Sequence, residues 1–357
     1  MPLYHVSLPA LSTSPGSIAV MQPLPDEQNR SVLALNHACE LWKLNLATGL
    51  TEQLLQIDIP ELNTYHPVQI VVSKNGQYAA ISNRFGRHAA VYDLLARQPI
   101  MKLSRDDYHS EVCTFPLAFA EIDGRSLLIH GTEWNRLDLT DVKSGELLSN
   151  RPQTNYDDDG YLNYFHGKLY VSQDQHWVVD TGWVWQPVGV IRFWNVRDWM
   201  NNARESEDGA SVGTPWHMLV DWDLPVAWVD AHTMAIWGQV DGDFFEEEDL
   251  PDEGALPVVI LFNVVTGERS ILLREAPAYK TTSQQEGVFP HPQGQLAADG
   301  VRLFLWGKRM NMTVWNRHDG VQEVTEKDFC PDIYHEEARL FLQLDLQGEI
   351  SAWRYTP

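Results

Sequence analysis

The sequence runs Val32-Leu-Ala-Leu-Asn36, then Cys39-Glu-Leu-Trp-Lys-Leu44, and then, after the turn Ala47-Thr-Gly49, Glu52-Gln-Leu-Leu-Gln-Ile57. Each run is short and is bounded by polar residues or glycine. Alternation of apolar and polar side chains over Glu40–Leu44, together with the Thr-Gly turn, is typical of antiparallel β-hairpins, because successive side chains of a strand point to opposite faces. This stretch therefore predicts hairpin-linked strands rather than a helix.

The same pattern recurs along the whole chain. Six further copies occupy residues 68–103, 115–148, 161–222, 232–267, 301–320 and 339–355. Seven units in 357 residues give a mean period of about 51, and self-similarity at such a period is the signature of a repeat architecture. Repeated four-stranded units predict an all-β chain that folds as a single seven-bladed β-propeller. A pair of β-sandwiches or an irregular β-barrel is the competing fold, whereas a β-helix has shorter and more regular repeats.

The two ends of the chain are expected to meet in one blade. The last unit, residues 339–355, lacks an outermost strand, and the segment Leu3–Leu8 lies ahead of the first unit. Because an all-β chain must cover its open sheet edges, we expect this N-terminal strand to complete the last blade and close the propeller. We expect one domain over residues 1–357, with insertions at about 197–215 and 241–254.

Two glycine-containing dipeptides predict tight hairpin turns. They are Asn75-Gly76 and Asp123-Gly124. Two-residue hairpin loops of this composition favour positive φ at both central positions, so we expect left-handed backbone at all four residues.

Several strand ends resemble the Trp-Asp position of WD-repeat-like β-propellers; they are Leu41-Trp-Lys-Leu44, Val91-Tyr-Asp93, Phe193-Trp-Asn195 and Val314-Trp-Asn316. The turns Ser73-Lys-Asn-Gly76 and His291-Pro-Gln-Gly294 look like the Ser-Pro-Asp-Gly turns of such blades. The stretch from Tyr164-Phe-His-Gly167 through Trp183–Val190 is similar to a segment of bacterial propeller-like proteins. The resemblance covers most of the chain with degenerate repeats and implies a propeller. The Gly-His dipeptide of true WD repeats is absent, and the fold hosts many functions.

The charge of the chain excludes some classes of partner. Lys and Arg number 26 against 49 Asp and Glu, a net charge of −23. Nucleic acids and anionic membranes require clustered basic residues, so neither is an expected partner, whereas an acidic surface favours a basic protein. No run approaches the roughly 18 apolar residues that span a bilayer, and the first residues lack a basic, then apolar, signal pattern. We expect a soluble, cytoplasmic protein whose three cysteines, Cys39, Cys113 and Cys330, stay reduced.

The most distinctive local feature is the acidic segment, residues 241–253, which has eight carboxylates and no basic residue. One interpretation is a docking surface in which two phenylalanines act as apolar anchors within an acidic collar. Its candidate partner-binding residues are Asp241, Asp243, Phe244, Phe245, Glu246, Glu247, Glu248 and Asp249. The alternatives are a calcium site, although the spacing departs from the EF-hand pattern, and a solvated insertion loop.

Eight tryptophans fall within 52 residues: Trp177, Trp183, Trp185, Trp194, Trp199, Trp216, Trp222 and Trp228. Trp183 and Trp185 have the two-residue spacing that places side chains on one face of a strand, and we take both as candidate partner-binding residues. They indicate either an aromatic platform for a peptide or sugar, or packing between blades. The acidic turn Asn155–Tyr161 also carries two tyrosines.

No catalytic motif is present. The chain lacks a Gly-x-Ser-x-Gly elbow, a phosphate-binding loop, a dinucleotide fingerprint and a His/Cys metal cluster, so we predict no catalytic residue, no metal ligand and no cofactor. The favoured hypothesis is a non-enzymatic protein-binding propeller, such as an immunity or antitoxin protein that neutralises a basic bacterial toxin. The alternatives are a lactonase-like hydrolase with a metal in the central channel and a carbohydrate-binding propeller.

Overall fold

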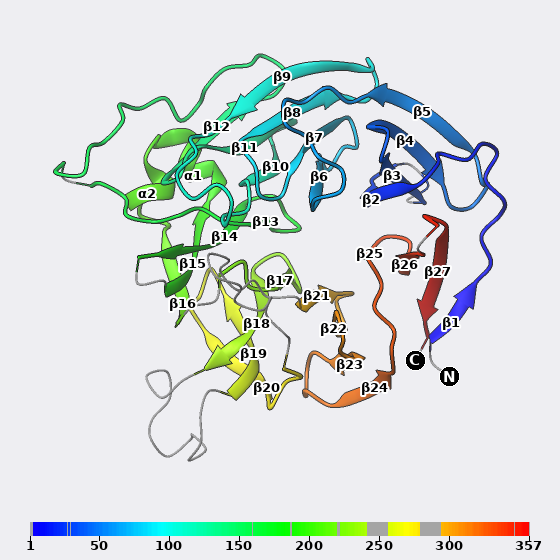
Figure 1. The fold of residues 1–357 in the computed structure, drawn as a ribbon. Coiled ribbons are helices and arrows are strands. Elements are labelled where there is room, and N and C mark those ends of the chain that lie inside the picture. The colour runs from blue at the N-terminus through cyan, green and yellow to red at the C-terminus, as the bar shows by residue number, and fades with distance from the viewer. Residues whose placement is uncertain are drawn as a thin grey trace.

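The described residues form seven antiparallel sheets arranged around a central axis (Figure 1). The computed structural model describes residues 3–26, 28, 30–158, 160–185, 188–219, 222–240, 256–278, 294–345 and 347–356. Blades one to three comprise β2 (Ile18–Leu24), β3 (Ser31–Asn36), β4 (Glu40–Asn45) and β5 (Thr51–Gln56); β6 (Val68–Val72), β7 (Tyr78–Asn83), β8 (His88–Asp93) and β9 (Gln98–Ser104); and β10 (Leu117–Ile122), β11 (Arg125–Glu133) and β12 (Arg136–Asp141).

Blades four to seven follow in chain order. They comprise β13 (Leu169–Val171), β14 (Trp177–Val184), β15 (Val188–Asn195) and β16 (Gly213–Leu219); β17 (Val226–Trp228), β18 (Thr233–Val240), β19 (Leu256–Asn263) and β20 (Arg269–Arg274); β21 (Gly294–Ala298), β22 (Arg302–Gly307), β23 (Met312–Asn316) and β24 (Gln322–Glu326); and β25 (Ile333–His335), β26 (Leu340–Leu344) and β27 (Ile350–Tyr355), with β1 (Leu3–Val6) as the fourth strand. The helices α1 (Val196–Asn201) and α2 (Glu205–Asp208) lie between β15 and β16.

The N-terminal strand completes the last blade, as predicted. β1 pairs antiparallel with β27, with Leu3 opposite Tyr355 and Val6 opposite Ala352. Both chain ends therefore lie at the same blade (Figure 1). The buried Leu3 side chain joins the apolar cluster of Phe304, Trp306 and Phe341 between the sixth and seventh blades, so the strand adds packing as well as ladder hydrogen bonds.

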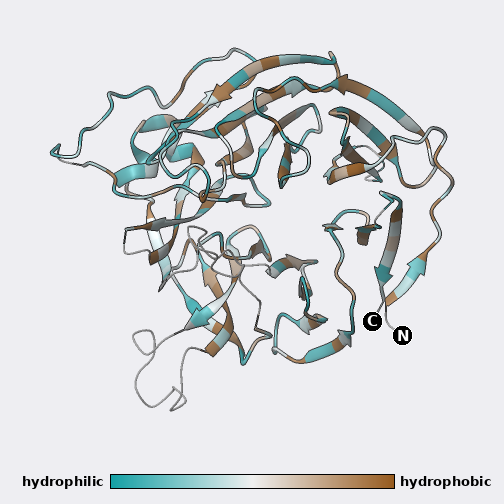
Figure 2. Ribbon diagram, viewed as in Figure 1, coloured by the Kyte–Doolittle hydropathy of each residue, from teal (hydrophilic) through white to brown (hydrophobic). Residues whose placement is uncertain are grey.

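The core lies between neighbouring blades. The second strand of each blade is covered on both faces, so Val32–Leu35 and Ala79–Ile81 are fully buried continuous runs rather than alternating ones. The brown, hydrophobic segments in Figure 2 lie mainly on the strands, whereas the loops and outer strands carry more teal. Each fully buried Leu or Ile contributes about 1.5–3 kcal/mol relative to exposure to water, so repeated blade contacts hold the ring together.

Two faces of the propeller follow from the antiparallel order. The turns between first and second strands, and between third and fourth strands, lie at one end of each blade, which we call face B. The hairpins between second and third strands and the connections from blade to blade lie at the other end, face A. Segments far apart in the sequence therefore meet on each face.

Blade three has three full strands among the described residues, and the fourth position holds only a short antiparallel bridge, Thr140 to Leu147, with Leu148 N–H donating to Leu139 O at 2.8 Å. Side chains cover the rest of the β12 edge: Leu139 N–H donates to Ser149 Oγ at 2.8 Å, and Arg151 Nη2 donates to Leu137 O at 3.0 Å. The buried Arg151 also pairs with Glu207 of α2 at 2.5 Å. Polar side chains thus satisfy an exposed edge and attach the helical insertion to it.

The two glycine-containing dipeptides adopt different turns. Asp123 and Gly124 have φ of 52° and 74°, as predicted, but of Asn75 and Gly76 only Gly76 (φ 70°) is left-handed, so the prediction was wrong for Asn75. Ser73 explains the difference: its carbonyl accepts from Gly76 N–H and its backbone N–H donates to Tyr78 O, which closes a longer turn.

The predicted insertion 197–215 contains most of α1, all of α2 and the first three residues of β16, whereas 241–254 lies outside the described residues. No helix among the described residues is long and apolar enough to cross a membrane.

Candidate functional site

A group of aromatic side chains gathers on face A of blades two to four. We call Tyr108, His109, Trp134, Tyr156, Tyr161 and Trp185 the aromatic surface. They come from the connection between β9 and β10, the β11–β12 hairpin, the connection between β12 and β13, and the residue that follows β14. Exposed fractions of 45% for Tyr108, 77% for Tyr156 and 42% for Trp185 are unusual for such large rings.

The rings contact one another at distances typical of edge-to-face packing. Tyr108 lies 5.5 Å from Trp134 and 6.5 Å from Trp185, and His109 lies 5.1 Å from Trp185, measured between ring centroids. Tyr156 and Tyr161 are 5.5 Å apart, and Tyr161 lies 6.3 Å from Trp134. Such pairs each contribute about 0.5–1.5 kcal/mol beyond burial, so the exposed rings hold one another in place.

A buried aromatic layer supports this surface from below. Phe165 stacks on Trp183 with centroids 4.0 Å apart, and Trp183 stacks on Trp222 at 5.0 Å. Trp183 Nε1–H donates to Cys113 Sγ at 3.2 Å. Burial raises the pKa of the Cys113 thiol to about 12, so it is a neutral, apolar part of this layer and not a nucleophile.

Arg105 fixes the segment that carries Tyr108 and His109. Its buried guanidinium donates from Nε to Gly86 O at 2.8 Å and from Nη2 to Cys113 O at 2.7 Å, with further bonds to two carbonyls of the same segment. Burial lowers the pKa of Arg105 to about 10, so the group remains charged at neutral pH. Hydrogen bonds from the charged Arg105 guanidinium to four carbonyl oxygens hold this connection in one conformation.

Asp223 ties the same segment to two other parts of face A. The buried carboxylate accepts from Thr114 Oγ1 at 2.6 Å, from Arg84 Nη2 at 3.2 Å and from Lys168 N–H at 2.9 Å. These donors come from the β7–β8 hairpin and from the connections that lead to β10 and β13. Because charge-assisted hydrogen bonds are about twice as strong as neutral ones, the loops of face A form a rigid base for the aromatic surface.

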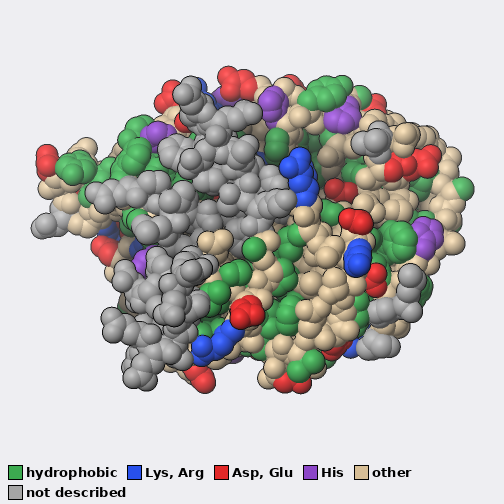
Figure 3. Space-filling model, turned by 60° about the horizontal axis from the view of Figure 1, so that its bottom comes forward, with side chains coloured by type: hydrophobic (Ala, Val, Ile, Leu, Met, Phe, Trp, Pro, Cys, Tyr) green, Lys and Arg blue, Asp and Glu red, His purple; other side chains and the backbone are tan. Residues whose placement is uncertain are grey.

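Exposed carboxylates occur on the segments that carry the exposed rings. Asp107, Glu111, Asp157 and Asp158 are exposed on the same connecting segments. His109 Nδ1 lies 3.6 Å from Glu111 Oε1. Figure 3 shows acidic side chains around much of the outline of the molecule, with Lys and Arg in fewer places. The aromatic surface thus combines apolar rings with negative charge.

The structure separates the two predicted tryptophans. Trp183 is fully buried, whereas Trp185 lies at the surface, and their centroids are 5.2 Å apart. Five of the eight clustered tryptophans are fully buried: Trp183, Trp194, Trp199, Trp216 and Trp222. Packing therefore accounts for most of the tryptophan concentration, while Trp185 keeps the role of a candidate contact residue.

The acidic segment lies outside the described residues, as do all eight candidate positions from Asp241 to Asp249. The strands on either side of it end at Val240 and begin at Leu256, which pair directly at the face A end of blade five. Sequence reasoning missed Tyr108, His109 and Trp134. Their only signal was an aromatic residue within a polar connection or hairpin, which is common in any chain.

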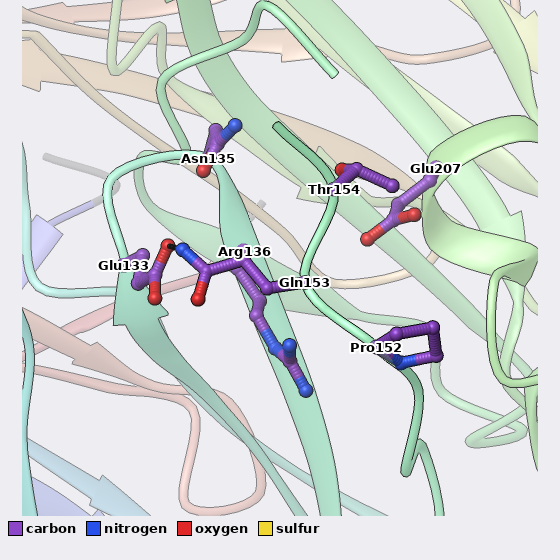
Figure 4. Close-up of a pocket in the computed structure, with 7 residues that line it drawn as sticks. All are labelled: Glu133, Asn135, Arg136, Pro152, Gln153, Thr154 and Glu207. Atoms are coloured by element: carbon purple, nitrogen blue, oxygen red, sulfur yellow. Dashed lines mark hydrogen bonds between the residues drawn. The ribbon is translucent and has the colours of Figure 1, made fainter. Parts of the chain in front are cut away.

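Metal-ligating side chains do not gather anywhere in the described part of the chain. No group of three or more His, Cys, Asp or Glu side chains there could hold a metal ion. A small polar pocket at the edge of blade three (Figure 4) already has its groups paired: Gln153 donates to Glu133, Arg136 to Asp138, and Asn135 to a backbone carbonyl. That pocket therefore leaves few groups free for a ligand.

The fold places the chain among seven-bladed β-propellers. Neither family models nor curated proteins match the chain. Among solved structures it is similar to U3-55K, with 12% identity, a TM-score of 0.59 and coverage of 99% of this chain and 98% of the other. It is also similar to the RRP9 WD40 repeats (12%, 0.57, coverage 98% and 99%) and to the β-propeller domain of Cps50 (Swd1) from Myceliophteria thermophila (9%, 0.55, coverage 99% and 100%). A chain of Kuenenia stuttgartiensis hydrazine synthase matches as well (10%, 0.56, coverage 97% and 97%), and at these identities the likeness shows the fold alone.

Proposed function

We propose that this chain is a non-enzymatic β-propeller that binds a basic protein through the aromatic surface. The observation that carries the proposal is the exposure of Tyr108, Tyr156 and Trp185 among carboxylates, on loops anchored by Arg105 and Asp223. Tyr and Trp are enriched at the centres of protein interfaces, where rigid rings lose little conformational entropy on binding. A rim of carboxylates favours partners that carry Lys and Arg.

The partner that we favour is a basic bacterial toxin, which would make this chain a cytoplasmic immunity or antitoxin protein. The net charge of −23 supports this finer proposal, because opposite charges accelerate association and neutralising proteins need fast, tight binding. The acidic segment would extend the contact, with Phe244 and Phe245 as apolar anchors. WD40 propellers as structural neighbours are compatible with a scaffold for protein binding.

The test compares three single variants of the full chain in affinity purification from the native host. Trp185→Ala and Tyr108→Ala remove exposed rings of the aromatic surface, and Leu95→Ala removes an even more exposed apolar side chain (77%) from the β8–β9 turn on face B. We expect a basic partner to be retained by wild type and by Leu95→Ala but to be reduced at least tenfold with either ring variant. Raising salt from 50 to 500 mM should weaken its capture.

A partner that is retained equally by all four proteins, or whose binding ignores salt, would contradict the proposal. The exposed rings also fit a sugar, because flat aromatic faces stack on apolar ring surfaces. A glycan array resolves this: binding that is lost in Trp185→Ala would favour a carbohydrate-binding propeller over a protein-binding one. For a metal-dependent hydrolase, the described residues offer no supporting cluster.

A further inference from the structure

A second site lies on face B, between blades six and seven. There a cavity of about 500 Å³ opens where the β21–β22 and β25–β26 turns approach the end of β27. Its walls come from both blades, which Figure 1 shows side by side, with the chain ends beside them. This volume lies within the range of small-molecule sites, about 300–1,000 Å³. None of the residues of the aromatic surface contributes to it.

One wall is aromatic and rigid. Phe304, Tyr334 and Phe341 pack against one another with centroid distances between 4.6 and 5.2 Å. Beside them, the Arg302 guanidinium lies over the Tyr355 ring at 5.2 Å. Phe304 and Phe341 are fully buried, so the rings that a ligand could contact without rearrangement are those of Tyr334 and Tyr355, which are partly exposed and pack on Phe304.

Arg302 itself is already neutralised. Its Nε donates to Glu323 Oε2 at 2.8 Å, and its Nη1 lies 3.3 Å from Asp299 Oδ2. Tyr355 Oη–H donates to the same Glu323 oxygen at 2.8 Å. The carboxylates of Glu323 and Asp299 therefore hold Arg302 and Tyr355 in place on this side of the cavity. The Arg302 guanidinium has few hydrogen-bond donors left for a ligand.

Three other donors that line the cavity lack such partners. Within the part of the chain that is described, the guanidinium of Arg339 and the hydroxyl of Tyr334 have no hydrogen-bond partner. Arg354 makes one long contact, from Nη2 to Ala338 O at 3.4 Å, while its buried Nε has no partner. Neither Arg339 nor Arg354 has an ion pair among the described residues, in a chain with almost twice as many acidic as basic residues, and the nearby carboxylates of Asp299 and Glu336 act on Tyr334 electrostatically. The remaining carboxylate of the lining, Glu337, is exposed.

We propose that this cavity binds a small organic anion, with one carboxylate or phosphate group on a flat apolar body. The anionic group would accept from Arg339, Arg354 and the Tyr334 hydroxyl, since guanidinium forks match the geometry of carboxylate and phosphate oxygens. The body would lie against the partly exposed rings of Tyr334 and Tyr355. An apolar pocket with a few convergent donors is the usual form of such a site. This site goes beyond the protein-binding function and does not depend on it.

The test uses four probes with the full chain. Saturation-transfer NMR titration measures the three probes that carry ring protons, and the affinity of inorganic phosphate, which has no non-exchangeable proton, is measured by competition with phenyl phosphate. Phenyl phosphate and benzoate carry both the anion and the ring, inorganic phosphate carries only the anion, and benzyl alcohol carries only the ring. We expect one of the two aromatic anions to bind saturably and at least tenfold more tightly than inorganic phosphate and benzyl alcohol, and the tighter of the two identifies the anionic group. Weaker preference, or no saturable binding of either aromatic anion up to 10 mM (about the limit of weak fragment affinity), would overturn the proposal.

Three variants locate the binding. Arg339→Gln removes an exposed charge, and Tyr334→Phe keeps the ring while removing the hydroxyl; each should weaken the better probe, by about tenfold for Arg339→Gln, because a hydrogen bond to a charged group contributes that much. Arg309→Gln is the matched control, because Arg309 lies in the β22–β23 hairpin of blade six, the other blade that lines the cavity, but on face A. Circular dichroism and thermal melting confirm that each variant is folded. Equal binding by wild type and Arg339→Gln, or an equal loss in Arg309→Gln, would contradict the assignment.

Discussion

Replacing Arg105 by methionine tests whether the aromatic surface rests on a fixed loop. The substitution keeps an unbranched apolar side chain but removes four hydrogen bonds to carbonyl oxygens, of Gly86, Ser110, Cys113 and Thr114, at 2.7–3.2 Å. A hydrogen bond to a charged group contributes about 1.5–3 kcal/mol, and the four are not additive, since water can reach some of the carbonyls. We therefore expect a loss of about 3–5 kcal/mol, the range found when one partner of a buried charged pair is removed.

Cys113 reports this loss directly, because it lies in the same segment, is buried and accepts from Trp183. Local opening exposes its thiol, so a loss of about 3 kcal/mol raises the rate of alkylation by iodoacetamide more than 100-fold, at about 1.36 kcal/mol per factor of ten. Peptide mass spectrometry measures the rate, with the partly exposed Cys39 and Cys330 as internal references.

The matched control is Arg125→Met, which removes a partly exposed arginine paired with Asp141 at 2.7 Å. A surface ion pair contributes about 0–1 kcal/mol, so Cys113 should stay protected in this variant. Unchanged protection of Cys113 in Arg105→Met, or equal deprotection in both variants, would refute the reasoning.

Three further predictions concern the fold. Leu3→Ala should lower the free energy of unfolding by about 2–4 kcal/mol because Leu3 is buried between the last two blades. Tyr4→Ala, at an exposed position of the same strand, should lower it by less than about 1 kcal/mol. Equal losses of the two variants in urea unfolding would contradict closure by β1. Gly76→Ala should destabilise more than Gly124→Ala, although both have positive φ, because a Cβ at Gly76 would meet Pro25 O at 2.1 Å while Gly124 has open space; similar melting temperatures would rule this out. Burial lowers the pKa of His335 in the folded protein, so the unfolded chain takes up more protons and the free energy of unfolding should fall as the pH drops below about 6.5. The fall should be smaller in His335→Gln. Urea unfolding at pH 7.5, 6.5 and 5.5 measures both proteins, and parallel pH profiles would contradict the prediction.

Much of the fold could be predicted from short-range patterns. Apolar runs separated by turns revealed the seven units, and the missing strand of the last unit revealed the role of Leu3–Val6, because a strand must be paired. The departure in blade three could not be predicted. There the fourth strand is reduced to a bridge at Leu147, and Ser149 and Arg151 cover the rest of the edge of β12. A single buried arginine leaves no periodic signal.

The candidate site was predicted only in part. Trp185 was identified by its spacing from Trp183, but spacing could not show that one ring is buried and the other exposed. Tyr108 and Trp134 lie 26 residues apart and meet because two different blades present their loops on face A. Arg105 and Asp223 depend on contacts between still more distant segments, so no local pattern marks them.

Site-specific photo-crosslinking tests the central claim most directly. A benzophenone side chain placed at Trp185 on face A, and in a separate protein at Leu95 on face B, is irradiated in extracts of the native host, and the crosslinked proteins are identified by mass spectrometry. We predict that position 185 captures a basic protein whose yield falls with added salt and that position 95 does not capture it. The same set of proteins from both positions, or a partner at position 185 that is acidic and insensitive to salt, would contradict the account.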